Sequence, residues 1–568
     1  MTYRWGSART ELPPFARYRS AMSDPPYPIH ADIEDRRGWR FLVRWVRSRP
    51  LSCIVLHTVP VTLLFVLFLV TDFRGVNFGH HWDESEWHTA PARQMVATGV
   101  LLPHKYIYPS FDKYLVLVPA IPAAVRAAFR PHADPRTVQA AMGAAMDAPD
   151  YLLATRRVYI TVSALAILWI YGAALVLRYR WWQAVVAAAG LALSWEFAYH
   201  ARWAVTDCIL VQFSALTLFL LALHHRTGNK NWLWAAAVAA GFGCGTKYTG
   251  LFLVGSVMLA GAFSIPFRHN LWGQVRRAMG IGALAVAVYL VTTPATVIDP
   301  VEFLMQTKGI SDYYGTQHGG YTATSGWNHI QIMLTFLALS FFSPCHLTAL
   351  LAFLVAIVGG VVLIREDRRL AAVLMFCPYF FLTAFCLRYR ITVVRNCLHT
   401  TPVLALLLGR GAGEVGRWIR NRWVRRAIAG ALAAGMVAQA IWLIGAAESI
   451  RHVDPKNQAR LALAYVGQHP KDRFRVSGMV RALGAQPGVK IPPNVTGDRA
   501  RDAKHVVFFA QQEGPNWWAW KTNDPWLAEA VFGPREVDFS WYSTWDGYDR
   551  VVVMAIDKAR SFGVELAK

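Results

Sequence analysis

The chain has 568 residues, of which 55% are hydrophobic and only 16% are charged. A soluble chain would carry charge on about a quarter of its residues, so this composition, with a mean hydropathy of +0.28, indicates a membrane protein. The formal net charge of +23 would suit a nucleic-acid partner, but the basic residues lie mainly between apolar runs. Anionic membrane lipids and the positive-inside rule explain them better, and we expect no nucleic-acid partner.

The first fifty residues are polar and basic. Six arginines lie close to the first apolar run: Arg36, Arg37, Arg40, Arg44, Arg47 and Arg49. The apolar run begins too late for a cleavable signal peptide. We therefore expect residues 1–50 to be a cytosolic basic lead-in that keeps the amino terminus inside.

Apolar runs that could cross a bilayer begin with Leu51–Val70. Ten more are predicted at Val158–Val176, Trp182–Phe197, Ile209–Leu223, Trp232–Gly245, Leu251–Ile265, Ala278–Thr292, Ser343–Ile364, Leu370–Leu387, Leu398–Leu408 and Ala427–Ile444. About eleven spans predict an all-α polytopic membrane protein. Residues 51–447 are the expected transmembrane catalytic domain. Its first outer loop, 71–157, holds amphipathic segments that are too short to span and are expected at the interface.

Short loops rich in arginine are predicted on the inside at 178–180, 224–230, 268–277, 365–369 and 410–426. An odd number of spans then places the tail, 448–568, on the outside as a soluble extracytoplasmic domain. Its short β-like runs at 506–509 and 550–554 alternate with helical stretches and predict a small α/β module. Aromatic clusters at 517–520 and 541–542 would suit selection of a sugar-bearing acceptor.

Three carboxylates, Asp83, Glu84 and Glu86, follow directly on the first apolar run. Carboxylates are costly near lipid and usually serve chemistry or ion handling there. The alternative is a helix N-terminus, where acidic residues favour the dipole and Asp caps well. The nearby histidines, His80, His81, His88 and His104, match no metal-ligand spacing and are expected to lie at the interface.

Cations recur on the side of the membrane that the topology makes the outer one. Arg202 lies five residues before Asp207, Lys247 stands alone between two spans, and the segment before Leu398 carries Arg388, Arg390 and Arg395. Such cations indicate an anionic ligand, most simply a lipid phosphate. The alternative is that they extend to ordinary lipid head groups.

An ordered set of motifs resembles family 39 of the glycosyltransferases, the protein mannosyltransferase-like and aminoarabinose transferase-like enzymes of the C-type membrane superfamily. The set begins with Asp83-Glu84, Ala90…Gly99 and Tyr106-Ile107-Tyr108-Pro109, and continues with Arg202…Thr206-Asp207 and Gly245-Thr246-Lys247-Tyr248-Thr249-Gly250. It ends with Arg395, Leu398 and Pro402, where Asn396 stands in place of the family's usual Tyr. The resemblance covers roughly Leu51 to Gly411 and does not extend to the tail.

The resemblance implies a multi-pass protein of the plasma membrane, the inner membrane in a bacterium, with an extracytoplasmic active site. It implies transfer of a monosaccharide from a polyprenyl-phosphate donor to a lipid, glycan or protein acceptor. Asp83 and Glu84 would be catalytic. Arg202, Lys247, Arg388, Arg390 and Arg395 would bind the donor phosphate, and Glu86, Tyr106, Tyr108 and Asp207 would bind substrate. Membrane lipids are expected partners. No metal ligand is assigned, no cofactor is certain, and a divalent metal ion is left open.

The alternative function is a polytopic transporter or lipid flippase of the cell envelope. Such proteins often show inverted repeats and mid-membrane charges. This chain shows no internal repeat, and its carboxylates gather in one outer loop. A further expectation concerns residues 294–328, which are rich in Gly and Tyr and are predicted to form a long, mobile loop over the active-site cleft.

Overall fold

A computed structural model gives the fold of the chain. It describes residues 51–77, 83–132, 134–264, 271–316, 322–450, 455–477, 480–481, 484, 491–496, 502–509, 529–532 and 551–561. The expected lead-in, residues 1–50, lies outside the described residues, as do His80 and His81.

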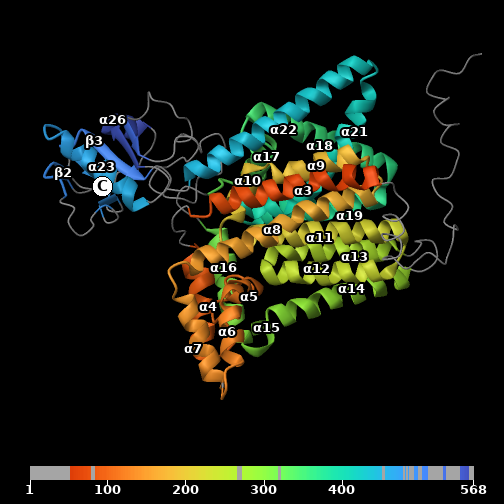
Figure 1. The fold of residues 1–568 in the computed structure, drawn as a ribbon, viewed down its shortest axis with the longest axis horizontal. Coiled ribbons are helices and arrows are strands. Elements are labelled where there is room, and N and C mark those ends of the chain that lie inside the picture. The colour runs from red at the N-terminus through yellow and green to blue at the C-terminus, as the bar shows by residue number, and fades with distance from the viewer. Residues whose placement is uncertain are drawn as a thin grey trace, which may run out of the picture. The chain divides into compact units, whose positions relative to one another are not determined.

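Long apolar helices lie side by side and form the main body (Figure 1). They are α3 (Leu51–Arg74), α8 (Tyr151–Val176), α9 (Trp181–Ala192), α11 (Thr206–Thr227), α12 (Lys230–Thr246), α13 (Leu251–Phe263), α14 (Leu271–Thr292), α18 (His346–Glu366), α19 (Arg368–Phe380), α21 (Thr401–Trp418) and α22 (Arg422–Ile450). Helix α8 packs against α9 and α11, α12 packs against α11, α13 and α14, and α21 packs against α9 and α18.

Each of the eleven predicted spans overlaps a helix among the described residues, but Trp182–Phe197 is divided between α9 and a second helix, α10 (Trp195–Ala201), and fewer qualify as spans on their own. Within the described residues, six helices have the length and hydropathy to cross a membrane: α8, α11, α14, α18, the segment Arg368–Arg388 that begins with α19, and α22. Helices α9, α12 and α13 have 12, 17 and 13 residues, fewer than the ~20 that a 30 Å hydrocarbon layer requires. The protein is a multi-pass, all-α membrane protein, as predicted, with fewer full-length spans than eleven.

Small residues allow the closest helix contact in the body. A Cβ atom on Gly359 of α18 would lie 1.9 Å from the carbonyl oxygen of Leu407, and one on Gly411 of α21 would lie 1.8 Å from that of Val355. Such approach is possible only without side chains, the packing that membrane helices commonly use.

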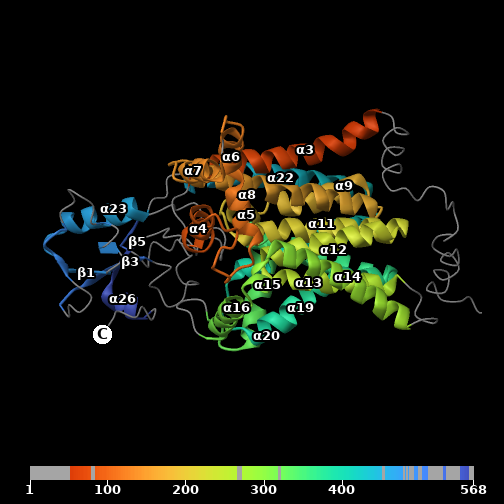
Figure 2. The ribbon, with the colours of Figure 1, turned by 90° about the horizontal axis from the view of Figure 1, so that it is seen from below.

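The first outer loop folds into short helices at one end of the bundle (Figure 2). They are the π-helix η2 (Glu84–Thr89), α4 (Ala90–Thr98), α5 (Phe111–Leu117), the 3-10 turn η3 (Val118–Ala120), α6 (Ile121–Ala128) and α7 (Pro135–Met146). Met95, Val116 and Met146 pack in one buried cluster with Tyr159 of α8 and Ile209 of α11. This cluster fixes the loop helices to the bundle.

The prediction of a long structureless segment at 294–328 is wrong. The segment contains α15 (Ala295–Ile298), α16 (Pro300–Gly315) and the start of α17 (Gly326–Leu339), with 317–321 outside the described residues. Pro300 occupies the first helical position, where its missing N–H costs nothing. Beyond α19 the chain passes through η5 (Phe381–Phe385), α20 (Cys386–Arg388) and η6 (Val394–Thr400) into α21.

The tail contains a small α/β fold. Its five strands are β1 (Phe474–Val476), β2 (Val495–Thr496), β3 (His505–Phe509), β4 (Ala530–Phe532) and β5 (Val551–Ala555), in the order β2-β1-β3-β5-β4. The β2-β1-β3 pairs are parallel and the β3-β5-β4 pairs antiparallel. Side chains of α23 (Pro455–Gln468) pack on the sheet through Leu463, and α26 (Ile556–Ser561) follows β5. The aromatic clusters at 517–520 and 541–542 lie outside the described residues.

Candidate active site

The acidic segment after α3 forms a π-helical turn. In such a turn the backbone bonds join residues five apart, so Asp83, directly before η2, and His88, within it, project to nearly the same side. An ordinary α-helix would separate these two side chains by more than a third of a turn. Helical turns of this kind are frequent at functional sites.

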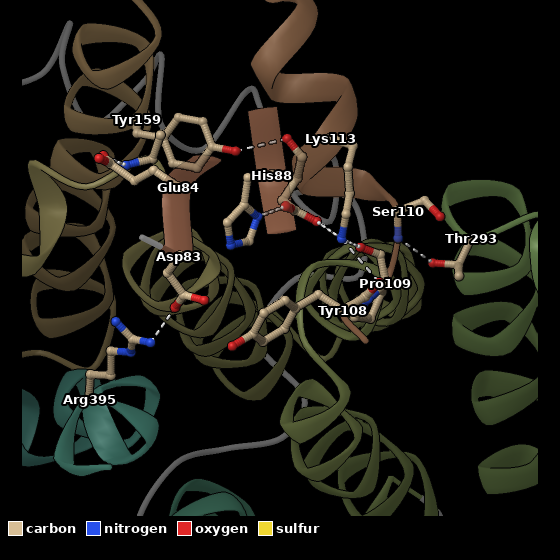
Figure 3. Close-up of polar contacts among 12 residues, drawn as sticks. Asp83, Glu84, His88, Tyr108, Pro109, Ser110, Lys113, Tyr159, Thr293 and Arg395 are labelled. Atoms are coloured by element: carbon tan, nitrogen blue, oxygen red, sulfur yellow. Dashed lines mark hydrogen bonds and ion pairs between the residues drawn. The ribbon is translucent and has the colours of Figure 1, made fainter. Parts of the chain in front are cut away.

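Asp83 is 1% exposed, and its Oδ2 accepts a hydrogen bond from Arg395 on η6 (Figure 3). The Arg395 Nε lies 3.4 Å from Oδ2 of Asp207, at the first turn of α11. The Arg395 guanidinium also lies over the Trp203 ring, 5.5 Å from its centroid. One arginine thus connects two buried carboxylates from distant parts of the chain.

Lys247 completes this cluster from the turn after α12. Its Nζ donates to Oδ1 of Asp207 at 2.5 Å and to Oδ1 of Asn396 at 2.6 Å. The backbone leaves α12 in an extended conformation at Lys247 and turns back within three residues. Gly250 allows this turn, because a Cβ atom there would lie 2.4 Å from the carbonyl carbon of Gly243.

Two tyrosines border the cluster. The Lys247 Nζ lies 5.9 Å from the centre of the Tyr108 ring. Burial, the carboxylate of Asp83 and the neighbouring Tyr314 raise the pKa of Tyr108. Burial also raises the pKa of Tyr314, on α16, to about 12. Both hydroxyls therefore stay protonated at neutral pH and can donate hydrogen bonds to an anionic group.

Glu84 faces a different partner from Asp83. Its two carboxylate oxygens accept from Nε and Nη2 of Arg156 on α8 at 2.8 and 2.5 Å, and the backbone N–H of Ala204 donates to Oε1 at 2.8 Å. Both side chains are at most 1% exposed. These contacts give Glu84 an anchoring position between the outer loop and α8, and its catalytic role stays a prediction.

Arg202 is buried but points elsewhere. Its Nη2 donates to Oδ1 of Asp72 on α3 at 2.9 Å, and its guanidinium lies 5.0 Å from the centre of the Trp195 ring. None of the contacts given for Arg202 reaches Asp207 or Lys247.

The other predicted binding residues also lie apart from the cluster. Arg388 and Arg390 are exposed, and the Arg390 Nη1 donates to the carbonyl of Thr324 at 2.9 Å. Glu86 is exposed. Tyr106 is fully buried, but its hydroxyl donates to Asp299 at 3.1 Å and its backbone N–H to Gln306, so it supports the α15–α16 segment.

Several residues of the site were given no role at the site from the sequence. Asn396 and Tyr314 border the cluster, and Arg156 anchors Glu84. His88 forms a hydrogen bond with Asp112, which Lys113 also contacts at 3.1 Å. The neighbouring opposite charges of Asp112 and Lys113 are the sequence feature that could have revealed the group formed by His88, Asp112 and Lys113. Within the described residues, no three His, Cys, Asp or Glu side chains gather to hold a metal ion.

Comparison with known families now bears on this site. Residues 143–304, from α7 to α16, match the family described as Dolichyl-phosphate-mannose-protein mannosyltransferase. The chain carries a protein mannosyltransferase family domain. The family assignment predicted from the motifs is confirmed, and the matched segment contains Asp207 and Lys247. No curated protein matches the chain by sequence.

Three solved structures are similar to this chain. ArnT from Cupriavidus metallidurans, bound to undecaprenyl phosphate, is 14% identical, with a TM-score of 0.46 over 87% of this chain and 97% of that one. The S. cerevisiae protein O-mannosyltransferase Pmt1-Pmt2 complex, bound to the sugar donor, is 18% identical, with a TM-score of 0.31 over 47% and 35%. The Archaeoglobus fulgidus oligosaccharyltransferase, in complex with Zn and sulfate, is 11% identical, with a TM-score of 0.41 over 80% and 69%.

Proposed function

We propose that the protein is a glycosyltransferase that moves a monosaccharide from a polyprenyl-phosphate donor to a hydroxyl group of a lipid, glycan or protein acceptor. One observation carries the proposal: ion pairs connect the buried Asp83 to Arg395, Arg395 to Asp207, and Asp207 to Lys247. Asp207 and Lys247 lie within the segment that matches the family, and Asp83 and Arg395 lie before and after it. The family match does not favour a transporter or flippase. The proposed location is the extracytoplasmic side of the plasma membrane, the inner membrane in a bacterium, because the arginine-rich loops predict that orientation.

In this proposal Asp83 is the general base. Its carboxylate takes the proton of the acceptor hydroxyl as the hydroxyl oxygen bonds to the anomeric carbon of the sugar. The bond from that carbon to the phosphate oxygen breaks, and the polyprenyl phosphate leaves with the electron pair. A phosphate is already a good leaving group, so stabilising its charge matters more than protonating it.

Lys247 and Arg395 are proposed to stabilise the departing phosphate. An ammonium group has three N–H donors, and two of those on Lys247 are directed to Asp207 and Asn396. The third has no partner among the described residues. Asp207 positions both cations, because it contacts Lys247 and Arg395 with different oxygens.

The proposal is tested with purified protein in lipid nanodiscs and polyprenyl phosphates that carry radiolabelled mannose, glucose, galactose or arabinose. Asp83→Asn keeps the size of the side chain and removes its basicity. We expect release and transfer of sugar to fall about 100- to 10,000-fold, the usual contribution of a general base. Asp147→Asn, at an exposed carboxylate of the same outer loop, is the matched control. Turnover by Asp83→Asn equal to that of the control would reject the role of Asp83.

A further inference from the structure

His88 is a fully buried side chain of the outer loop whose two ring nitrogens have different surroundings. Its Nδ1 pairs with Oδ2 of Asp112 on α5. Its Nε2 is buried and has no hydrogen-bond partner within the described part of the chain. Buried polar groups almost always have a hydrogen-bond partner. A buried ring nitrogen without one is therefore a candidate to form a hydrogen bond with a bound substrate.

The Asp112 carboxylate determines which ring nitrogen of His88 holds the proton. Burial works against ionisation of Asp112, but Lys113 and His88 outweigh it and lower the pKa of this carboxyl group. The hydroxyl of Tyr159 donates to the Asp112 backbone carbonyl at 2.8 Å and holds this part of α5 against α8. An ionised Asp112 accepts a hydrogen bond from Nδ1–H of His88. In the neutral imidazole, Nε2 is then the acceptor.

Nε2 faces the proposed reaction site. In Figure 3 this edge of the His88 ring is turned toward Asp83 and Tyr108, whereas the opposite edge is directed to the carboxylate beside Lys113. The Tyr108 ring stacks on His88 with centroids 5.3 Å apart. The π-helical turn brings Asp83 and His88 to the same side, as described above. Two hydrogen-bond acceptors of different kind, an imidazole nitrogen and a carboxylate, are therefore directed to the same side of the outer loop.

We propose that His88, oriented by Asp112, determines specificity by accepting a hydrogen bond from a substrate hydroxyl group next to the reacting centre. The inference rests on the proposed function. A hydroxyl group has one proton to donate, so the attacking hydroxyl that donates to Asp83 cannot also donate to His88. His88 requires a second hydroxyl, which belongs either to the donor sugar or to a hydroxyl-rich acceptor.

The experiment compares the unaltered protein with His88→Phe, which removes the acceptor nitrogen, and His88→Gln, whose amide oxygen can accept in its place. The probes are polyprenyl phosphates that carry mannose, glucose, galactose or arabinose, and their 2-deoxy counterparts. Two reactions are measured: hydrolysis of the donor without acceptor, and transfer of sugar into a cell-envelope extract. Thermal unfolding in nanodiscs identifies folded variants, and His88→Leu replaces His88→Phe if the latter does not fold.

We expect His88→Phe to lower kcat/KM about tenfold or more, because sites built to bind a hydroxyl discriminate strongly, and His88→Gln to recover most of the loss. A loss in hydrolysis that disappears with the 2-deoxy sugars assigns the hydroxyl to the donor. A loss confined to transfer assigns it to the acceptor. Unchanged kcat/KM in a folded His88→Phe or His88→Leu, or equal losses in His88→Phe and His88→Gln, would overturn the inference. If the unaltered protein turns over none of the probes, the proposed function itself fails.

Discussion

The pair formed by Glu84 and Arg156 predicts a large effect on stability. Glu84→Gln removes the charge but keeps an oxygen for the Ala204 N–H, which donates to Glu84 at 2.8 Å. It removes the Glu84 carboxylate from the charge of the buried Arg156, whose Nη1 also donates to the Val76 carbonyl at 2.9 Å. Removing one partner of a buried ion pair costs about 3–5 kcal/mol. We therefore expect a fall of several degrees in the unfolding midpoint.

The assay is thermal unfolding in nanodiscs, followed by donor turnover at a temperature where each variant is folded. Arg156→Met should lower the midpoint by a similar amount. The double variant should be less destabilised than the sum of the single changes, because it leaves no unpaired buried charge. Glu86→Gln, at an exposed position two residues further on, controls for loss of a carboxylate. A Glu84→Gln protein with an unchanged midpoint and abolished turnover would refute the anchoring role and restore the catalytic one.

Three further predictions concern packing, exposed cations and the tail. Gly411→Leu should prevent folding or strongly reduce the yield of folded protein in size-exclusion chromatography, because even a Cβ atom would lie 1.8 Å from the Val355 carbonyl oxygen; a normal yield would contradict the packing of α18 on α21. Arg388→Ala and Arg390→Ala should each change the apparent donor KM less than about twofold, because exposed charges contribute little. A tenfold rise in KM would instead support their predicted role in binding the donor phosphate. Removal of the tail beyond Ile450 should preserve donor hydrolysis and abolish transfer to the natural acceptor, because the proposed donor site lies upstream; loss of hydrolysis in a folded truncation would show that the tail helps to form that site.

The sequence predicted the helical body because apolar runs of membrane length leave few alternatives to helix. It also predicted a site on one side of the membrane, and ion pairs connect four of its predicted residues, Asp83, Asp207, Lys247 and Arg395. Their proximity was predictable because the topology placed all of them on the same side of the membrane, although they come from separate segments. The same prediction included Glu84, Arg202, Arg388 and Arg390, which these ion pairs do not include.

Pairing partners could not be read from the sequence in the same way. Glu84 adjoins Asp83 in the chain, yet contacts Arg156 on α8, a choice made by tertiary packing. Arg202 likewise pairs with Asp72 on α3. His88 was expected at the interface because its spacing from the other histidines matches no metal-ligand motif. The π-helical turn that brings it to the same side as Asp83 is not signalled by hydrophobic periodicity.

The segment 294–328 was predicted to form a long, mobile loop because it is rich in Gly and Tyr. The missed signal was local: Pro300 at the first position and Gly315 at the last mark the two ends of α16. This helix also brings Tyr314 to the site.

Native mass spectrometry of lipid that co-purifies with the protein tests for a polyprenyl-phosphate site at Lys247 and Arg395. We expect a bound polyprenyl phosphate, with or without its sugar, on the unaltered protein. Lys247→Met should bind this lipid at least about tenfold more weakly than the unaltered protein does, because a charge-assisted contact to phosphate contributes about 1.5–3 kcal/mol. Lys230→Met, at the exposed opposite end of α12, should retain the lipid. Two results would contradict a polyprenyl-phosphate site at Lys247. The unaltered protein could carry ordinary phospholipids and no polyprenyl phosphate, or the unaltered protein and both variants could carry equal amounts of polyprenyl phosphate.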